Sequence, residues 1–337
     1  MKNKFFFREL TIVLLAVFLV TSCTDEIDRP VFPVSATIFH SVKDKQVAFT
    51  ALTHSAVSWQ WDFGDGKTST EQNPVHVYET GGYYKAKLTA TDNSGQTATS
   101  EVKLAIELTP YALLTGDWTA EDYKGKTWKL NSNHSAFDIL ANSDAGLSLF
   151  DEDIPVLPSG TLGLYLGLGE AYNDEFTFFY DGKYTQDTKD GSSFGGIVYA
   201  MVMQQLGLST ITKTGGEDVF GADAFAFTTY TPDANATFVF TENDDFTIPT
   251  IPDFATGVQP PGIPVVTYND VMTIDFPDSN EFIGIRDFQR KVIVQSISDK
   301  SMRLVMFLTM SPDAIVSQDP LIVLSTSAMV LTFEAVD

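Results

Sequence analysis

The 337-residue chain contains one cysteine, four histidines and only 21 Lys and Arg residues against 44 Asp and Glu residues. A single cysteine excludes an internal disulfide framework, and so few histidines argue against a histidine-based metal cluster. The formal net charge of −23 repels phosphate backbones, so we predict that nucleic acid is not a partner. The N-terminal apolar run, Leu10–Val20, has 11 residues, about half of the roughly 20 that span a bilayer.

This apolar run has the setting of an export signal. Lys2, Lys4 and Arg8 precede it, and the small residues Thr21 and Ser22 follow it, which predicts that residues 1–22 are cleaved. Cys23 would then be the first residue of the mature chain. The sequence Val20-Thr21-Ser22-Cys23 resembles the lipobox of bacterial lipoproteins, which implies lipidation of Cys23 and a tether over residues 23–30. The alternative is an unrelated cysteine beside an ordinary cleavage site.

The residues after the cysteine are acidic. Thr24-Asp25-Glu26-Ile27-Asp28 resembles the surface-export signal of Bacteroidetes lipoproteins. The resemblance implies an outer-membrane protein that is lipid-anchored and faces the cell exterior, with an outer-membrane transport protein as an expected partner. No basic patch is present to assist membrane attachment, so the acyl chains must supply it. Alternatively, these acids only keep a tether solvated.

Charge divides the remaining chain in two. Residues 31–108 carry six Lys against eight acidic residues, whereas residues 109–285 carry six Lys against twenty-six. Thr109-Pro110 has the composition of a hinge. We therefore predict two domains, at residues 31–108 and 109–337, both built from short strands, which makes the fold class all-β.

The first domain shows alternating polarity broken by turns about every ten residues. Val57, Trp59 and Trp61 stand at i, i+2 and i+4, which predicts one strand face and favours a core position for both tryptophans over a sugar-stacking role. Several segments together resemble the PKD domain in order and spacing: Trp59–Gly66, Asn73–Tyr78, Gly82–Tyr84 and Thr91–Gly95. The resemblance implies an immunoglobulin-like sandwich that serves as a spacer or interaction module, without catalytic residues.

Three polar residues of this domain have two interpretations each. His76 fits a hydrogen-bonded structural histidine better than a metal ligand. Asp62 and Asp65 are carboxylates that suit Ca²⁺, but the Asp62–Gly66 segment is also typical of a turn. We favour the turn.

The spacing of short strands in the second domain predicts a larger β-sandwich or jelly roll. One helix is expected at Ser193–Leu206, capped by Ser193. Strands are expected at residues 125–130, 175–180, 224–230, 236–241, 265–276, 291–296, 302–310 and 328–335. Prolines 249, 252, 260, 261 and 264 predict a stiff connection.

Parts of this domain resemble, more weakly, the β-sandwich that follows PKD modules in Bacteroidetes surface lipoproteins of polysaccharide-utilisation systems. The matching pieces are Gly125–Trp128, Tyr172–Phe178 with Asp181-Gly182, and Phe282–Gly284. That pattern also has a Trp-rich segment, whereas residues 145–170 here contain Tyr165 and no tryptophan, which puts an inherited sugar site in doubt.

The search for reaction chemistry is negative. No Glu-x-Asp-x-Glu arrangement of the kind used by sandwich-type glycoside hydrolases occurs, and no phosphate-binding Gly-rich loop follows a clear strand. We therefore predict that the protein is not an enzyme and has no cofactor. Acidic loops at Asp151–Asp153 and Glu242–Asp245 offer oxygen ligands for calcium, although a solvated acidic surface explains them as well.

The leading hypothesis is a non-catalytic surface protein that binds a polysaccharide or oligosaccharide. Sugars stack on aromatic faces and hydrogen-bond to Asp, Asn and Gln. The candidate residues are Trp118, Trp128, Tyr165 and Tyr172, each of which also fits a core position. Two alternatives stay open: a glycoside hydrolase with an unrecognised carboxylate pair, and a structural envelope lipoprotein.

Overall fold

The computed structural model of the chain describes residues 32–250, 264–277, 280–318 and 321–336. The predicted signal, Cys23 and the tether lie outside these residues, as do Pro252, Pro260 and Pro261. Two compact units are present: the first takes in the described residues up to Ser41, Ala48–His76 and Ala86–Val102, and the second holds Val42–Val47, Val77–Lys85 and everything from Lys103 onward. The boundary predicted after residue 108 stays a prediction. Among the described residues, no helix is both long and apolar enough to cross a membrane.

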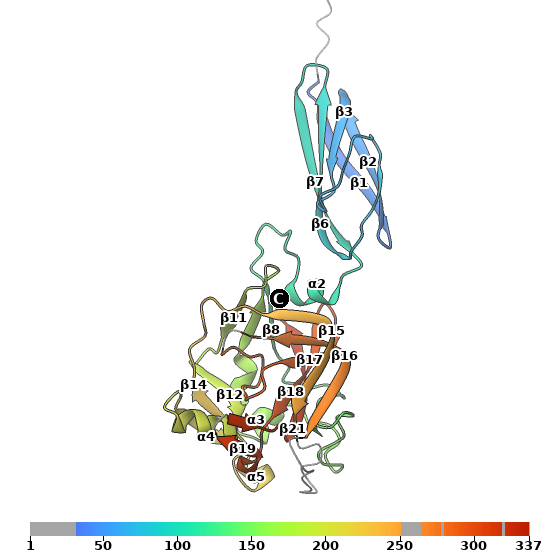
Figure 1. Cartoon of the computed structure of the whole chain (residues 1–337). Helices are drawn as coiled ribbons and strands as arrows, with labels where there is room; N and C mark the ends of the chain where they lie inside the picture. Colours follow the sequence, from blue (N-terminus) through green and yellow to red (C-terminus); the bar gives the residue numbers. More distant parts are fainter. Residues whose placement is uncertain (1–31, 251–263, 278–279, 319–320, 337) are drawn as a thin grey trace, which may run out of the picture. The chain divides into compact units, whose positions relative to one another are not determined.

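The first seven strands form two sheets, drawn in blue to green in Figure 1. One sheet has the order β1-β2-β5 and the other β4-β3-β6-β7. The strands are β1 (Ser35–Lys43), β2 (Gln46–His54), β3 (Ala56–Asp62), β4 (Thr68–Ser69), β5 (Val75–Val77), β6 (Gly82–Asp92) and β7 (Thr97–Ile106).

Alternating burial confirms the predicted sandwich. Val47, Phe49 and Ala51 of β2 are buried while their neighbours are exposed, as a strand with one solvated face requires. On β3 the prediction is right for Trp61, which is fully buried, but Trp59 is only partly buried and Val57 is exposed. The β3–β6 register shifts between Ala56 and Ser58, so Val57 stands in a bulge that re-aims its side chain.

The polar residues of the Asp62–Gly66 turn have structural partners. Asp62 Oδ1 accepts from the Gly64 N–H (2.9 Å), and Asp65 Oδ1 accepts from the Lys67 N–H (3.0 Å). His76 is buried, lies parallel to the Phe63 ring at 4.1 Å, and has Nε2 2.7 Å from Asp65 Oδ2. The predictions of a structural histidine and of turn chemistry are confirmed.

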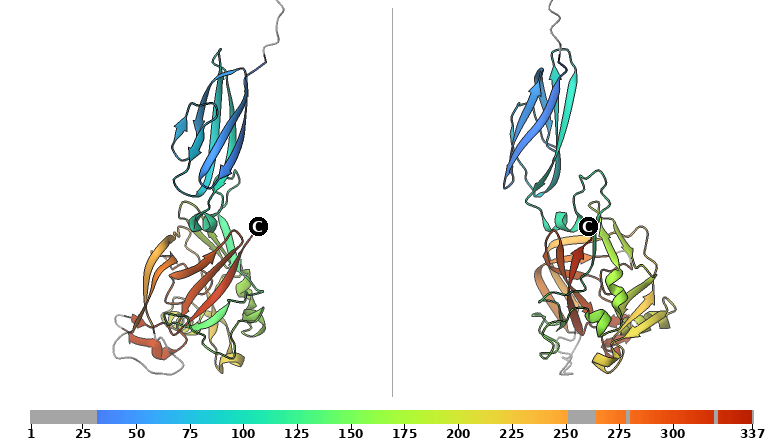
Figure 2. Two further views of the ribbon diagram at one scale, coloured as in Figure 1. Left: turned by 90° about the vertical axis from the view of Figure 1, so that its right-hand side faces the viewer. Right: turned by 180° about the vertical axis from the view of Figure 1, so that it is seen from behind.

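The second unit is a β-sandwich whose larger layer is a nine-stranded sheet of order β11-β10-β8-β21-β18-β17-β16-β15, with β9 also paired to β21. In Figure 2 its strands from β15 onward are drawn in orange and red, and its strands β8 to β11 in green. Its strands are β8 (Lys126–Leu130), β9 (Ile139–Asn142), β10 (Glu175–Phe178), β11 (Tyr184–Asp187), β15 (Val239–Pro249), β16 (Val265–Asp275), β17 (Val292–Ile297), β18 (Ser301–Leu308) and β21 (Ser327–Ala335).

The other elements of this unit are shorter. A second sheet has the order β12-β14-β13, and β19 pairs with β20. The elements are α2 (Pro110–Thr115), α3 (Thr161–Leu164), η1 (Gly169–Asn173), β12 (Ser192–Gly196), α4 (Ile197–Gln205), β13 (Ile211–Gly215), α5 (Glu217–Phe220), β14 (Phe225–Thr229), η2 (Pro312–Ala314), β19 (Ile315–Gln318) and β20 (Leu321–Val323).

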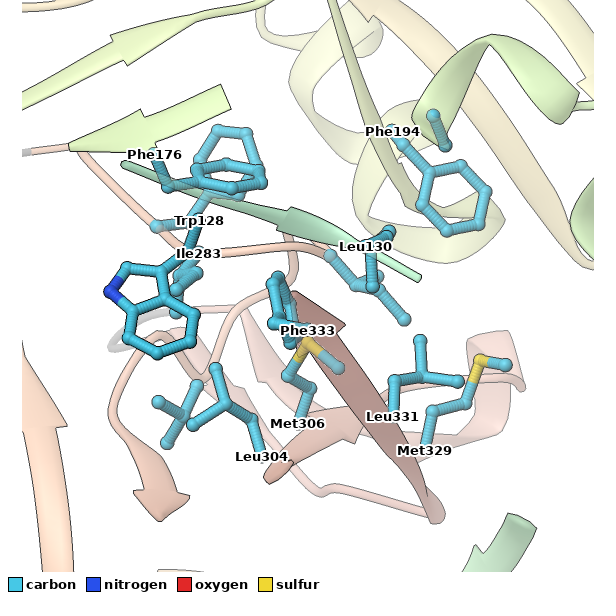
Figure 3. Packing of buried hydrophobic residues seen from close by; sticks show 14 of the residues in the cluster. Trp128, Leu130, Phe176, Phe194, Ile283, Leu304, Met306, Met329, Leu331 and Phe333 are labelled. Carbon is cyan, nitrogen blue, oxygen red and sulfur yellow. The ribbon is translucent and has the colours of Figure 1, made fainter. Parts of the chain in front are cut away.

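The central strands β18 and β21 are buried on both faces. Leu304, Met306 and Leu308 of β18 join a core cluster with the β12-β14 sheet, whereas the intervening Val305 and Phe307 join a second cluster on the opposite face. Figure 3 shows part of the first cluster, including Trp128, Phe176, Phe194 and Phe333. Two-sided burial explains why these strands are continuous apolar runs without alternation.

The loop 281–290 fills the space between the sheets. Residues 281–287 are all buried, and the guanidinium carbon of Arg286 lies 4.6 Å from the Tyr230 ring centre and 5.4 Å from that of Tyr199. These aromatic faces stabilise the buried cation.

This loop also explains why the helix predicted at Ser193–Leu206 begins later in the structure. Gly195 pairs with Arg286, and a Cβ on Gly195 would lie 2.5 Å from the Arg286 carbonyl oxygen. Residues 192–196 therefore form strand β12 against the loop, and the helix begins only at Ile197. Ser193, predicted as its cap, is a buried strand residue.

Each of the eight expected strands is present, and in all but one of them the ends shift by at most two residues. The acidic segment Glu242–Asp245, expected as a loop, instead lies inside β15, which is much longer than the predicted 236–241. The β15–β16 register shifts on both sides of Asp244, so the segment is a bulged strand.

Gly284 offers a test of this packing. Its φ is +72°, and a Cβ there would lie 2.7 Å from Met306 Sδ and 2.8 Å from Phe333 Cζ, both buried. Left-handed backbone strain and overpacking add, so we expect Gly284→Ala to lower the free energy of unfolding by about 3 kcal/mol, as measured by urea denaturation. Gly146→Ala is the matched control, because its Cβ would meet only Asp144 Oδ1 at an ordinary 3.5 Å. Equal stability of the two variants would contradict the packing.

Candidate ligand-binding surfaces

A groove of about 510 Å³ runs over β16, β17 and β18. It lies where two bulges interrupt the sheet, one between Val294 and Ser296 on β17 and the other around Asp244 on β15. Bulges re-aim side chains, and here Gln295 stands in the bulge next to the Ser296–Arg303 pair. We call this feature the sheet groove; its lining residues used below are Tyr268, Asp270, Met272, Gln295 and Arg303.

The sheet groove combines hydrogen-bonding groups with apolar surface. The Arg303 guanidinium lies 4.1 Å above the Phe137 ring, which is 61% exposed. Within the described residues, neither Arg303 nor Gln295 makes a side-chain hydrogen bond, and Arg303 Nε is buried without a partner. Asp270 adds a carboxylate beside them. Donors and an acceptor therefore meet in one hollow, with the exposed Phe137 ring beside it.

The acids beside the groove have protein partners. Asp244 Oδ2 lies 2.5 Å from Lys291 Nζ and accepts from Thr273 Oγ1 (2.8 Å). The Lys291 ammonium holds the pKa of Asp244 below its usual range. Over the described residues, no group of three or more His, Cys, Asp or Glu side chains is placed to hold a metal ion.

Trp118 stands in a second exposed place. It stacks on Tyr180 with ring centres 5.2 Å apart and an interplanar angle of 23°, and the two rings are 37% and 45% exposed. Two hydroxyls fix Tyr180, since its carbonyl accepts from Tyr111 and its N–H donates to Tyr123, each at 2.8 Å. Sequence reasoning missed Tyr180, although an aromatic residue directly before the Asp181-Gly182 turn is a signal of exposure.

Two of the four predicted ligand residues are structural, which corrects the prediction. Trp128 is completely buried, and its indole N–H donates to the Leu114 carbonyl (3.0 Å), because residues of β8 that point inward meet the sheet core. Tyr172 is partly buried, and its hydroxyl accepts from the Leu162 N–H (3.0 Å) and contacts His134 Nε2 (2.7 Å). Neither ring is free to stack on a ligand.

Tyr172 belongs to a buried polar chain. His134 Nδ1 lies 2.9 Å from Asp138 Oδ2, which also accepts from the Thr332 N–H (3.0 Å). Burial raises the pKa of Asp138, but hydrogen bonds from His134, Ser135 and Thr332 outweigh it and lower the pKa. An ionised carboxylate only accepts, so Nδ1 carries a proton. The chain ties the loop before β9 to strand β21.

Tyr165 is 50% exposed but lines a different, apolar cavity, which is described below. No residue pair among the four candidates is in contact in the described structure. Neither Tyr268, which lines the sheet groove, nor Phe137, which packs against the groove residue Arg303, was among the candidates.

The buried acids are poor catalysts because no substrate reaches them. Asp174 and Asp287 are only 2% and 1% exposed. Burial raises the pKa of Asp174 to about 8, helped by the charges of Asp190 and Asp187, and burial raises the pKa of Asp287 to about 7. Neither lines the grooves or cavities described here.

Ser193 occupies a Gly-x-Ser-x-Gly sequence, Gly191 to Gly195, the spacing of a nucleophile elbow. In the structure it lies within strand β12 and is fully buried, with Oγ 3.1 Å from Thr228 Oγ1. An elbow instead exposes its serine on the turn between strand and helix. The motif is coincidental here.

Comparison with known proteins bears on the first domain. Residues 33–106 match the PKD domain family. The PKD domain of this chain therefore covers the strands β1 to β7 described above.

Matches to individual proteins are short. Collagenase ColQ1 of Bacillus cereus (strain Q1) is 53% identical over 51 residues, 15% of this chain and 5% of the collagenase. The chain spans only 5% to 8% of the length of the curated relatives it matches.

Solved structures add two likenesses. The PKD1 domain of Vibrio cholerae metalloprotease PrtV is 30% identical and covers 23% of this chain and all of that domain, with a TM-score of 0.22. A second solved structure is described as concerning carbohydrate-binding modules from the β-sandwich superfamily. It is 14% identical, and the match covers 91% of this chain and 93% of that chain, with a TM-score of 0.24. Scores this low carry no argument about the ligand.

Asp174 makes stability depend on pH. Its native pKa is raised to about 8, so between about pH 4 and pH 8 the native state keeps a proton that the unfolded state has lost. Native stability therefore falls as pH rises through this window. We expect Asp174→Asn to remove that part of the fall, so that its stability relative to wild type improves by several kcal/mol, at most about 5, between pH 4 and pH 8, since one pKa unit corresponds to about 1.4 kcal/mol. Urea unfolding at both pH values checks this, with exposed Glu121→Gln as the control; an unchanged pH profile would contradict it.

Proposed function

We propose that the protein is a non-catalytic carbohydrate-binding lipoprotein of the bacterial outer membrane. In this proposal the sheet groove of the second unit binds a polysaccharide or oligosaccharide, and the PKD domain is a spacer or interaction module. Participation in polysaccharide utilisation rests on the weak sequence resemblance noted above.

The sheet groove is the observation that carries the proposed ligand. A sugar presents neighbouring hydroxyls on one edge and C–H groups on its faces. The side chains of Arg303 and Gln295 have no hydrogen-bond partner in the described residues, so they are available to donate to sugar hydroxyls. The Asp270 carboxylate can accept hydrogen bonds from sugar hydroxyls. Met272 and the Tyr268 ring line the groove, and the exposed Phe137 ring beside Arg303 extends the apolar contact.

The protein's own packing prepares the groove for binding. The guanidinium of Arg303 is already held against the Phe137 ring, and the Tyr268 hydroxyl is fixed by donating to the Asp144 carbonyl (2.9 Å). Side chains that are ordered before binding lose less conformational entropy when the ligand arrives.

Binding is tested by isothermal titration calorimetry of the full-length chain against neutral and uronic-acid oligosaccharides, and by pull-down on insoluble glycans. We expect Arg303→Ala to weaken binding about 10- to 100-fold, the size of losing hydrogen bonds to a charged donor. Phe137→Ala should weaken it about fivefold or more.

Two control variants separate the groove from the other surfaces. Phe39→Ala removes a similarly exposed phenylalanine from β1, 57% exposed, and should leave affinity unchanged. Trp118→Ala probes the exposed Trp118–Tyr180 pair. Loss of binding in Trp118→Ala but not in Arg303→Ala would move the site to that pair, and no glycan retained at millimolar concentration would refute carbohydrate binding.

The lipid anchor is a separate proposal with its own test. We expect metabolic labelling with palmitate to mark the wild-type chain and not Cys23→Ala, because the thiol is the acyl acceptor. Protease treatment of intact cells should cleave the wild-type protein if it faces the exterior. Labelling that persists in Cys23→Ala would contradict the anchor without bearing on the ligand.

A further inference from the structure

An apolar cavity of about 420 Å³ lies in the second unit, apart from the residues of the sheet groove. Its inner wall is made by core residues, among them Leu140 of β9, Met329 of β21 and Phe225 of β14. Exposed side chains border it, including Tyr165 of the segment after α3 and Phe220 of α5. The volume falls in the range of pockets that hold small organic ligands, about 300–1,000 Å³.

The lining chemistry does not suit a saccharide. The polar side chains of the lining are Asp151, Asp153, Thr161 and Tyr165. Thr161 is already engaged, since its hydroxyl donates to the Pro158 carbonyl (2.5 Å). The remaining lining residues are aliphatic, aromatic or proline, so a bound molecule must bring an apolar body.

The cavity wall is anchored to the rest of the fold. The Leu157 N–H donates to the Asp138 carbonyl (2.8 Å), and Asp138 is the centre of the buried chain with His134. The Gly160 N–H donates to the Ser132 carbonyl (2.7 Å), and the Leu162 N–H donates to the Tyr172 hydroxyl. Hydrogen bonds to three other parts of the fold therefore hold this wall in place.

The charged side chains of the lining determine which kind of polar group a ligand can bring to the cavity. Asp151 and Asp153 line the cavity and are exposed, and the lining contains no Lys, Arg or His. Two carboxylates repel an anionic head and attract a cation. We propose that this cavity binds an amphiphilic small molecule with an alkyl or aromatic body and a cationic head beside Asp151 and Asp153.

Three detergents with the same tail test the proposal: decyltrimethylammonium, decyl maltoside and decyl sulfate, each below its critical micelle concentration. Calorimetry with the full-length chain should give the tightest binding for the cation. We expect roughly three- to tenfold weaker binding for the neutral head, since each exposed carboxylate contributes little, and still weaker binding for the sulfate. Equal affinity for all three, tighter binding of the sulfate, or no binding would overturn the proposal.

Variants locate the site and separate head from body. Replacing both Asp151 and Asp153 with Asn should abolish the preference for the cation and keep the neutral affinity. Glu152→Gln removes a charge between them that does not line the cavity, and it should preserve most of the preference. Tyr165→Ala should weaken all three ligands, whereas Arg303→Ala in the sheet groove should change none.

A second copy of the chain is the competing occupant. Sedimentation analysis over a range of protein concentrations distinguishes it, because self-association would raise the mass and decyltrimethylammonium would lower it again. Association that Tyr165→Ala abolishes would mean that the cavity is an interface between copies, and it would overturn the small-molecule proposal. A monomer at all concentrations that binds the cation supports it.

Discussion

Two-sided burial of the central strands is the constraint on which the second unit depends. Strands β18 and β21 carry one core on each face, so a large part of the nine-stranded sheet is closed to ligands. Recognition surfaces are left where that burial ends. The sheet groove lies where bulges on β15 and β17 break the regular pattern, and the apolar cavity lies where the first core cluster reaches the segment around Leu157 and Leu166. The two candidate sites are thus consequences of the packing.

Most strands could be predicted from the sequence because buried strands consist mainly of apolar residues. Runs of Val, Ile, Leu and Phe identify β17, β18 and β21, where both faces are buried. The prediction failed at β12, whose Ser-Ser-Phe-Gly-Gly sequence has no such signal. That strand exists because Phe194 pairs with Phe227 of β14 and because Gly195 lets the Arg286 loop approach. Phe227 and Arg286 are both distant from β12 in the chain, so no local sequence pattern predicts these contacts.

The candidate site was harder to predict than the fold, and the reason is register. From the sequence, Trp118 and Trp128 are equally good ligands, but Trp128 shares an inward strand face with Leu130 while Trp118 lies outside the strands. Arg303, Gln295 and Asp270 come together only through strand pairing and bulges. The one available hint was Arg303 itself, a charged residue in an otherwise apolar strand. Such a residue needs a partner or a wet hollow.

The weak resemblance to polysaccharide-utilisation lipoproteins rests on residues that build the fold. Trp128, Phe176 and Phe282 are all buried in the first core cluster. Gly284 is required by a positive φ and by its approach to Met306 and Phe333. Such positions constrain how a chain folds, and they say nothing about what its surface binds. The ligand must therefore be argued from side chains outside that set. The two proposals rest on such side chains, Arg303 beside Phe137 in one place and Asp151 with Tyr165 in the other, so the two candidate sites differ in the chemistry that they offer a ligand.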